Sequence, residues 1–414
     1  SRRLARPRIV LLNQVVGPVF RQLSEELAEH LGPAWLLTGS LGEIQTIRHE
    51  RLRLIPAANY RRGNTWDRLT SWLIYFAQAA RIVAASPRQA LLFIVSTPPF
   101  LPLLGWLASI ARSQRYAVLV YDIYPDILIS AGRTASDSLL ARAWRAMNRL
   151  VWNRATMVLT IGRYMARKLE TMFEPARLAA GKIEVIPNWA DIAAVAPLAK
   201  ADNPFAGRHG QCGKLTVLYC GNVGESHDIG SLIEAADRLR SEGDINFMIV
   251  GRGARWDHVR REIAARSLTN VIMLGWQHES QLRYVLTTGD VAVVSLDAGF
   301  EALSVPSRVY YALAAGSAIL AVSRGPDELQ ELIEQHRCGL HVQPRSPDAL
   351  AAAIRRFRDD PDLLEQCRRN ARLAAERYFS RPVCAARYVA AVSSVLEAPK
   401  ASRPNVARAG SRSA

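Results

Sequence analysis

The sequence predicts an α/β protein of two doubly wound domains that face each other across a cleft. Short apolar runs, typical of buried parallel strands, alternate along the chain with longer segments that have the apolar spacing of helices. This alternation stops near residues 190–213 and then begins again, so the 414 residues divide into two α/β units. In sheets of this kind, ligands bind beyond the carboxyl ends of the strands.

The first half of the chain contains apolar runs that we expect to be parallel strands. These are Ile9–Leu12, Trp35–Thr38, Leu52–Ile55, Leu91–Val95, Ala117–Tyr121, Met157–Thr160 and Lys182–Ile186. Helices are expected through Glu25–His30, near Trp66–Ala85, near Ser138–Trp152 and through Leu169. The charge-free run Leu91–Ala111 is long enough to span a bilayer. We interpret it instead as a strand, a loop and an apolar helix from about Phe100, because Pro98, Pro99 and Pro102 interrupt it.

The second half repeats this pattern. Strands are expected at Leu215–Tyr219, Asn246–Val250, Val271–Leu274, Val291–Ser295 and Ala318–Val322, and helices at Ile229–Arg240, Pro361–Tyr378 and Pro382–Leu396. The resulting division is a first domain over residues 1–195, a linker over 196–213 and a second domain over 214–378. We expect the helix over 379–397 to pack back toward the first domain, and the basic segment 398–414 to be disordered.

The net charge of +16 is concentrated in the first half of the chain. Residues 1–195 carry 25 Lys and Arg against 13 Asp and Glu, whereas residues 196–397 carry 24 of each kind. Within the first half, segment 51–115 combines arginines such as Arg61, Arg62 and Arg68 with Trp66 and other aromatic residues. Tryptophan beside arginine is typical of a membrane interface, and no nucleic-acid-binding motif accompanies it. We therefore expect an anionic membrane surface as a partner; a buried helix with a basic outer face is the alternative.

The composition argues against a disulfide framework and against a metal centre. The five cysteines are scattered, with no CxxC pair and no clustering with histidine, which is typical of a reducing compartment. Asp360 belongs to an Asp-x-Asp triplet, but it directly precedes Pro361. We interpret this pair as the start of a helix rather than as a cation site. We expect no metal and no bound cofactor.

The segment Val305–Gly316 places a turn, an arginine and the start of a helix next to one another. Pro306 suits the last loop position or the first helical turn, and Ser307 could cap the exposed backbone N–H groups. Arg308 then lies in the first turn, where the helix dipole disfavours a cation unless an anion binds there as well. The alternatives are therefore an anion site and a surface arginine on a capped core helix.

Several segments together resemble the retaining glycosyltransferases of family 4. The similar segments follow in order within residues 8–395, and they are 182–191, Val217–Gly224, Ile249–Gly253, Asn270–Trp276, Gly289–Leu296 and Val305–Gly316. Residues 96–99 and 121–126 are most similar to the branch that assembles bacterial exopolysaccharide, capsule and O-antigen. The resemblance implies the GT-B arrangement of two Rossmann-like domains, with a nucleotide-sugar donor in the second domain and the acceptor in the first.

The resemblance also implies which residues form the site. The donor would be bound by Gly221, Asn222, Gly224, Arg252, Trp276, Ser304, Val305, Ser307, Arg308 and Tyr311, and the acceptor by Gly17, Tyr121 and Asp122. The catalytic candidates are Asp122, which could orient the acceptor or cap a strand end, and Arg308, which could neutralise the donor diphosphate. Structural alternatives stay open: Gly17 could be a turn glycine, Arg252 could lie in a solvated loop, and Trp276 could pack in the core.

Three regions differ from the pattern that many members of this family share. Tyr311 occupies the position of a glutamate near the donor helix. Asn222 and His227 lie where an arginine and a lysine are common, and Tyr121 takes the place of a sugar-contacting histidine. These differences make Arg308 the strongest cationic candidate for the donor diphosphate.

We therefore expect a glycosyltransferase that moves a sugar, with retention, from a nucleotide-sugar to a polyprenyl-diphosphate-linked saccharide. It would work without a metal, in the cytoplasm, at the inner face of the inner membrane. One alternative is a nucleotide-sugar epimerase of the same fold class, which would need acid and base carboxylates in the cleft. Another is a non-catalytic scaffold in a polysaccharide-assembly complex, which would bind no nucleotide.

Overall fold

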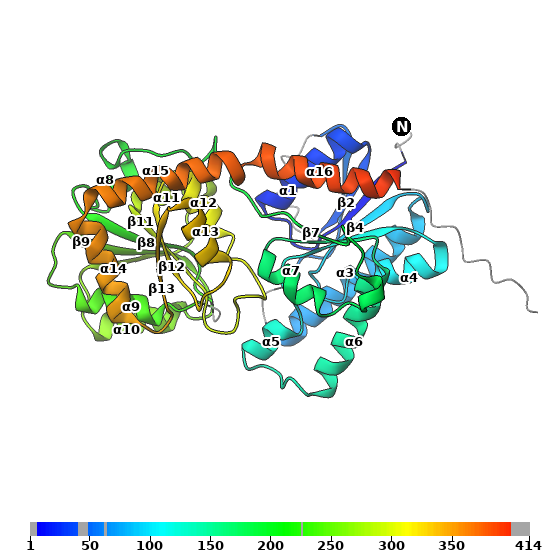
Figure 1. Ribbon diagram of the computed structural model, residues 1–414, viewed down its shortest axis with the longest axis horizontal. Helices are drawn as coiled ribbons and strands as arrows, with labels where there is room; N and C mark the ends of the chain where they lie inside the picture. Colours follow the sequence, from blue (N-terminus) through cyan, green and yellow to red (C-terminus); the bar gives the residue numbers. More distant parts are fainter. Residues whose placement is uncertain (1–5, 40–48, 62–63, 225–226, 399–414) are drawn as a thin grey trace, which may run out of the picture.

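Two parallel sheets lie side by side in the computed structural model, and helices cover both faces of each (Figure 1). The structure describes residues 6–39, 49–61, 64–224 and 227–398. The expected fold class, two doubly wound α/β domains, is confirmed. Arg62 and nearly all of the segment that was expected to be disordered, 398–414, lie outside the described residues.

The first sheet has the strand order β3-β2-β1-β4-β5-β6-β7. Its strands are β1 (Ile9–Leu12), β2 (Ala34–Thr38), β3 (Leu52–Pro56), β4 (Leu91–Val95), β5 (Tyr116–Val120), β6 (Met157–Thr160) and β7 (Ile183–Val185). The helices between them are α1 (Pro18–Leu31), α3 (Thr65–Ala85), α4 (Leu103–Arg112), α5 (Asp126–Ser130), α6 (Leu139–Arg154) and α7 (Arg163–Glu170). Strands are added outward in opposite directions from β1 and β4, so the switch point of this sheet lies at their carboxyl ends.

The second sheet has the strand order β10-β9-β8-β11-β12-β13, with its switch point between β8 and β11. Its strands are β8 (Leu215–Asn222), β9 (Ile245–Arg252), β10 (Val271–Leu274), β11 (Val291–Ser295), β12 (Ala318–Val322) and β13 (Gly339–Val342). Its helices are α8 (Pro204–Arg208), α9 (Gly230–Arg238), α10 (Trp256–Ala265), α11 (Leu282–Thr288), α12 (Arg308–Ala315), α13 (Glu328–His336), α14 (Pro347–Asp359) and α15 (Pro361–Tyr378). The sequence did not predict β13, whose side chains are mostly half-buried at the edge of the sheet.

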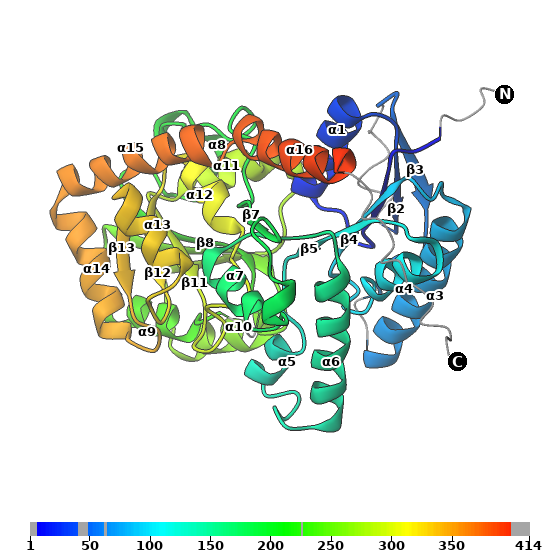
Figure 2. The same cartoon turned by 45° about the vertical axis from the view of Figure 1, so that its right-hand side comes forward.

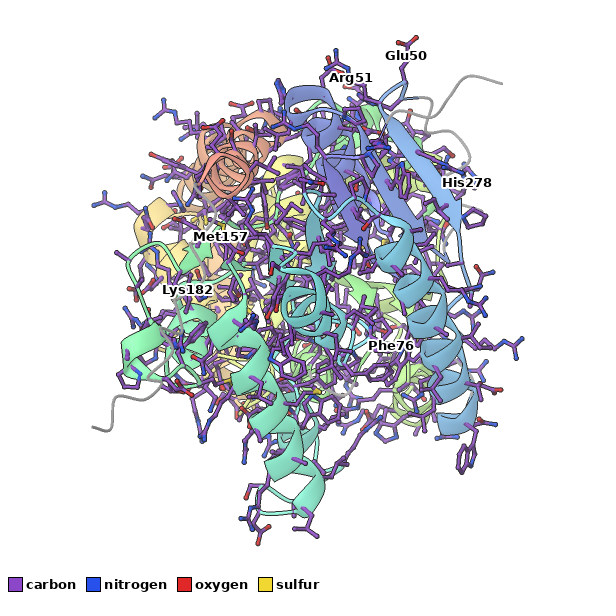
Figure 3. The ribbon with its side chains drawn as sticks, turned by 90° about the vertical axis from the view of Figure 1, so that its right-hand side faces the viewer. Glu50, Arg51, Phe76, Met157, Lys182 and His278 are labelled. Carbon is purple, nitrogen blue, oxygen red and sulfur yellow. The ribbon has the colours of Figure 1, made fainter. Side chains whose placement is uncertain are left out.

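Each sheet separates two layers of core side chains, because successive residues of a strand point to opposite faces. In β1, Val10 and Leu12 pack with side chains of α3, α4 and α6, whereas Ile9 and Leu11 pack on the side of α1. Figure 3 looks onto the first domain and shows α3, α4 and α6 beside one another, with Phe76 of α3 among them. The apolar runs become buried strands because both faces are covered by helices.

Two segments connect the domains. Residues 196–213, expected to be a linker, contain α8, whose Phe205 packs with Leu218 and Met248 of the second domain. The long helix α15 lies along the second domain, and α16 (Arg381–Glu397) continues onto the first (Figures 1 and 2). There Tyr388 packs against Trp189, with ring centroids 6.0 Å apart. Helix α16 thus connects the second domain to the core of the first.

The run Leu91–Ala111 does not form a single helix. It consists of β4, a turn and most of α4, which begins at Leu103 rather than at about Phe100. In the segments that the structure describes, no helix combines the length and the apolar character needed to cross a membrane.

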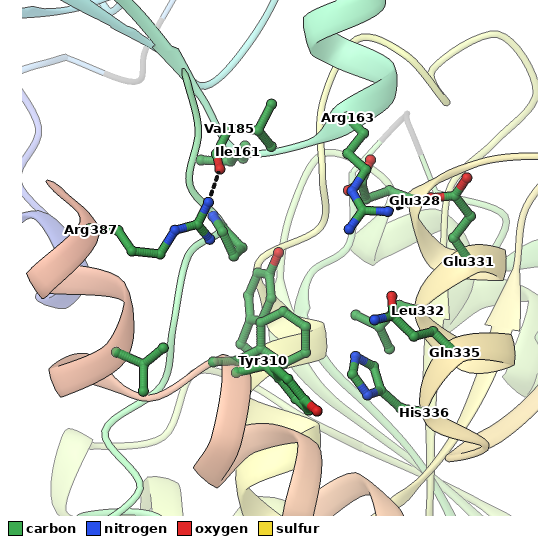
Figure 4. A pocket seen from close by; sticks show the side chains of 14 residues that line it. Ile161, Arg163, Val185, Tyr310, Glu328, Glu331, Leu332, Gln335, His336 and Arg387 are labelled. Atoms are coloured by element: carbon green, nitrogen blue, oxygen red, sulfur yellow. Dashed lines mark hydrogen bonds and ion pairs between the residues drawn. The ribbon is translucent and has the colours of Figure 1, made fainter. Parts of the chain in front are cut away.

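The two domains also touch where the first turn of α7 meets the first turn of α13. The amide N–H of Tyr164 donates to the Glu328 carboxylate at 3.3 Å, and the Tyr164 hydroxyl donates to Glu331 at 2.9 Å. A Cβ atom at Gly162 would lie 2.8 Å from Val305 and 3.0 Å from Glu328. Figure 4 shows Glu328 and Glu331 at a cavity of about 510 Å³ between the domains. Because these carboxylates lie at the positive ends of two helices, they stabilise the contact between the domains.

We predict that Gly162→Ala will push the two domains apart. The added methyl group would overlap Val305 and Glu328, and such overpacking costs about 1–3 kcal/mol unless the contact opens. Small-angle scattering should therefore give a larger radius of gyration than for the wild type, and the melting temperature should fall. Gly243→Ala is the matched control, since a Cβ atom there meets nothing within 4 Å. Equal scattering and melting for both variants would contradict this account of the contact.

Candidate active site

A cavity of about 570 Å³ lies between the two domains, where the ends of β5 and β8 meet the start of α12. Most of the residues predicted for the site line it, and these are Asp122, Gly221, Asn222, Trp276, Ser304, Val305, Ser307, Arg308 and Tyr311. An adjoining cavity of about 370 Å³ is lined by Gly17, Tyr121 and Asp122. The two cavities share Asp122, Val305, Ser307 and Tyr311, so the donor and acceptor candidates line adjoining cavities. Their roles in binding stay predictions.

Arg308 is the first residue of α12, and its guanidinium is held from two sides. Its Nη2 atom lies 2.5 Å from Nε2 of His227, and its Cζ atom lies 4.6 Å from the centroid of the Tyr219 ring. The Nη1 atom is buried and makes no hydrogen bond within the described part of the chain. A buried N–H group without an acceptor costs about 1–3 kcal/mol, which a bound anion would recover. This arrangement favours an anion site over a surface arginine.

The backbone beside Arg308 is shaped by glycine. Gly221 has a φ of +141°, a conformation that residues with a Cβ atom rarely adopt. A Cβ atom there would lie 3.7 Å from the Arg308 guanidinium, so the glycine leaves space beside the cation. The next residue, Asn222, is fixed through its carbonyl oxygen, which accepts a hydrogen bond from the Tyr219 hydroxyl at 2.7 Å. The end of β8 therefore forms a defined wall of the cavity.

His227 is a residue that the sequence showed only as a departure from the common family pattern. It lies on the loop that follows β8, at the switch point of the second sheet, and this position is the signal that could have identified it. Its Nδ1 atom is 2.7 Å from the carbonyl oxygen of Ser295, at the end of β11. Burial, followed by the nearby charge of Arg308, lowers the pKa of His227 to about 3. The imidazole is therefore neutral at physiological pH.

Two predicted donor residues do not line the cavity. The guanidinium of Arg252 lies over the ring of Trp256, 5.4 Å from its centroid, in a cation–π contact that turns it away. Gly224 lies behind Asn222, whose amide nitrogen would be 2.8 Å from a Cβ atom at that position.

Two expectations about side-chain packing and capping are wrong. Trp276 lines the cavity but does not pack in the core, because 57% of its surface is exposed. Ser307 holds the N-cap position of α12, yet its side chain accepts no hydrogen bond from the helix, since its backbone is already helical, with φ −57° and ψ −18°. Asp360, in contrast, caps α15 as predicted, and its carboxylate accepts from the amide of Leu363 at 2.9 Å.

The adjoining cavity, which is lined by the acceptor candidates, lies at the ends of β1 and β5. Gly17 precedes α1, and a Cβ atom there would meet nothing within 4 Å, so the turn leaves open space. The amide of Tyr121 donates to the hydroxyl of Ser96, at the end of β4, over 3.3 Å. Burial raises the pKa of Asp122 to about 6. This carboxyl can therefore change its protonation state near neutral pH.

Metal binding is not indicated by the described ranges, in which no group of three or more His, Cys, Asp or Glu side chains is arranged to hold an ion. The positive charge near the cavity is supplied by Arg308 and by the N-terminus of α12. Together with the unfilled Nη1 donor, they make this wall of the cavity suitable for an anionic ligand such as a phosphate.

Two family models match the chain in succession. A "Glycosyl transferase 4-like domain" matches residues 16–189, and "Glycosyl transferases group 1" matches residues 209–374. The chain is 28% identical over 279 residues to the probable glycosyltransferase WbjE of Pseudomonas aeruginosa, covering 67% of this chain and 68% of WbjE. It is 30% identical over 246 residues to the putative colanic acid biosynthesis glycosyl transferase WcaI of Escherichia coli K12, covering 58% of this chain and 59% of WcaI.

Solved structures with the same fold extend over nearly the whole chain. Sucrose-phosphate synthase from Thermosynechococcus elongatus has a TM-score of 0.75 at 18% identity, covering 94% of this chain and 99% of that one. HepE of Anabaena, solved in complex with UDP-glucose, has a TM-score of 0.71 at 16% identity, covering 93% and 99%. At these identities the likeness concerns the fold alone. With both family models in order on the expected architecture, the chain belongs to the GT-B glycosyltransferases that join a glycosyl transferase 4-like domain to a group 1 domain.

Proposed function

We propose that this enzyme transfers a sugar from a nucleotide-sugar to a polyprenyl-diphosphate-linked saccharide, with retention, in the assembly of a bacterial cell-surface polysaccharide. The observation that carries the proposal is the guanidinium of Arg308 at the cavity between the domains, whose Nη1 atom is buried and makes no hydrogen bond within the described residues. The name of WbjE supports glycosyl transfer, and that of WcaI, a putative colanic acid biosynthesis glycosyl transferase, supports a role in bacterial polysaccharide assembly. The HepE complex with UDP-glucose supports a nucleotide-sugar donor.

The donor diphosphate would lie against Arg308. Breaking the bond between the sugar and the phosphate builds negative charge on the leaving nucleoside diphosphate. Arg308 lies at the positive end of α12, so the guanidinium and the helix dipole stabilise the same charge. A phosphate bound there would supply the acceptor that the buried Nη1 atom lacks within the described residues. In this proposal the leaving group needs no metal ion.

We predict that Arg308→Ala will slow sugar transfer about tenfold or more, because it removes a charge that stabilises the leaving diphosphate. The measurement is a screen of nucleotide-sugars with extracted lipid acceptor, read by mass spectrometry, followed by kinetics with the best donor. Arg261→Ala, an exposed arginine on α10, is the matched control and should leave transfer unchanged.

Near-wild-type transfer by the Arg308→Ala variant would refute the phosphate role of this residue. If the wild type showed neither transfer nor a thermal shift with any nucleotide or nucleotide-sugar, the scaffold alternative would replace the enzyme. Interconversion of free nucleotide-sugars without transfer would favour the epimerase.

Asp122 would orient the acceptor hydroxyl at the junction of the two cavities. It lines both of them, whereas Gly17 and Tyr121 line only the acceptor side. An ionised carboxylate accepts a hydrogen bond from a hydroxyl and thereby raises the hydroxyl's reactivity. A protonated carboxyl loses most of this capacity.

We predict that transfer will depend on pH through Asp122. Its pKa is about 6, so the carboxyl becomes protonated as the pH falls through that value. The ratio kcat/KM for the acceptor should therefore decrease below a pH of about 6 and level off above it. The Asp122→Asn variant should be slow and should lack this inflection. The same inflection in that variant would assign the titration to another group.

An exposed apolar surface of the first domain would hold the enzyme on the membrane. On α3, Trp66 is 76% exposed and Leu73 is 61% exposed, and on the neighbouring α4 Ile110 is 51% exposed. The outer face of α3 is thus apolar in its first half, which supports a lipid-facing surface over the alternative of a buried helix with a basic outer face. Exposed apolar side chains of this size, close to arginines such as Arg61, are typical of binding to an anionic lipid surface.

We predict that replacing both Trp66 and Leu73 with Glu will reduce binding to vesicles that contain phosphatidylglycerol. The change removes apolar contact with the lipid and adds charges that anionic headgroups repel. Co-sedimentation with vesicles at low and high salt measures the effect. Leu373→Glu on α15, where the leucine is 42% exposed, is the matched control. Equal vesicle binding by the double variant and the control would exclude this surface.

A further inference from the structure

We propose that His227 is a positioning residue for sugar transfer, which holds the Arg308 guanidinium in place by accepting a hydrogen bond from it. The inference rests on the proposed binding of the donor diphosphate by Arg308. The geometry behind it is the short contact of 2.5 Å between Nη2 of Arg308 and Nε2 of His227. An arginine always carries its protons, so this contact requires a lone pair on the histidine nitrogen.

The protonation state of the imidazole follows from its second contact. Nδ1 lies 2.7 Å from the carbonyl oxygen of Ser295, and a carbonyl oxygen can only accept a hydrogen bond. Nδ1 therefore carries the proton and donates it, which leaves the lone pair on Nε2 for Arg308. His227 is 8% exposed, and its low pKa keeps a second proton from competing for this lone pair.

The loop that carries His227 is itself anchored. The carboxylate of the next residue, Asp228, accepts from the amide of Arg345 at 2.6 Å and from the amide of Ser231 at 3.1 Å. These contacts tie the loop to the start of α9 and to the segment after β13. The imidazole is therefore fixed at both ends, through its backbone and through its ring.

Because His227 is a neutral acceptor, the charge of the site near Arg308 is that of the arginine. Tyr219 covers one face of the Arg308 guanidinium and His227 accepts from Nη2, while Nη1 is buried and makes no hydrogen bond within the described residues. A lysine at position 227 would place a second cation against the first and would repel it. His227 thus orients the guanidinium without adding charge, and the full positive charge of Arg308 stays available to the donor diphosphate.

Two substitutions separate positioning from a merely structural role. In His227→Gln, the side-chain amide reaches the place of Nε2 and its oxygen can accept from Arg308. In His227→Asn, the amide nitrogen takes the place of Nδ1 and can donate to Ser295, but no acceptor remains for Arg308. Each variant therefore keeps one of the two hydrogen bonds of the imidazole, the one to Arg308 in His227→Gln and the one to Ser295 in His227→Asn.

The experiment measures affinity for UDP or GDP, whichever the wild type binds, together with KM and kcat for the nucleotide-sugar. We expect His227→Asn to weaken nucleoside diphosphate binding and raise the donor KM about tenfold, as for a lost hydrogen bond to a charged group, and His227→Gln to stay within about threefold of the wild type. The effects of His227→Asn and Arg308→Ala should not add in the double variant, because both act through the same cation.

The opposite order, with Asn tolerated and Gln impaired, would assign His227 to anchoring the loop at Ser295 and would overturn the proposal. Additive effects in the double variant would overturn it as well. A wild type that binds no nucleotide would instead refute the proposed function on which the inference rests. Melting temperatures of the variants show whether any loss of binding reflects unfolding.

Discussion

The position of one cation at the positive end of a helix governs the arrangement of this site. Arg308 begins α12, where the helix dipole disfavours a positive charge. The surrounding structure offsets this cost with a ring below the guanidinium and a neutral imidazole beside it, and both are buried. Neither partner neutralises the charge. The structure thus keeps a concentrated positive potential facing the cavity, which is suited to an anion whose charge increases during a reaction.

The two-domain architecture brings the candidate donor and acceptor residues together. All strands of a parallel sheet have their carboxyl ends on the same side of the sheet, and these sides of the two sheets face each other across the cavity. Val305 links the site to the contact between the domains, since it lines both cavities and also packs against Gly162. A change in the separation of the domains would therefore move a wall of the site. Helix α15 belongs to the second domain, and the next helix, α16, packs on the first. This connection limits how far the two domains can separate.

Much of the fold could be predicted from the sequence, because apolar runs that are buried on both faces leave a clear pattern. The runs at Ile9–Leu12 and Ala318–Val322 became strands with the expected bounds. Strands at the edges of the sheets were harder to predict from the sequence. The short strand β13 contains Gly339 and His341 and is only partly covered, so it lacks a continuous apolar signal. Trp276 follows β10, the other edge strand, and is exposed for the same reason.

The candidate site was predictable where it depended on position along the chain and unpredictable where it depended on side-chain direction. Arg308 and Gly221 follow from the order of motifs, since both lie at the ends of elements that meet at the switch point. The turn of Arg252 onto Trp256 and the approach of His227 to Arg308 are contacts between distant segments, which no local pattern encodes. For His227 the family comparison was misleading. It showed only that a common lysine is absent, and it did not indicate that the histidine contacts Arg308 as a neutral partner.

The most direct test of the central claim is a comparison of nucleoside diphosphate with nucleoside monophosphate binding by calorimetry. Arg308 is assigned to the diphosphate, so the wild type should bind the diphosphate more tightly than the monophosphate of the same base. In Arg308→Ala this preference should largely disappear, while the affinity for the monophosphate changes by less than about threefold. An unchanged preference in the variant would contradict the claim that Arg308 recognises the donor through its phosphates.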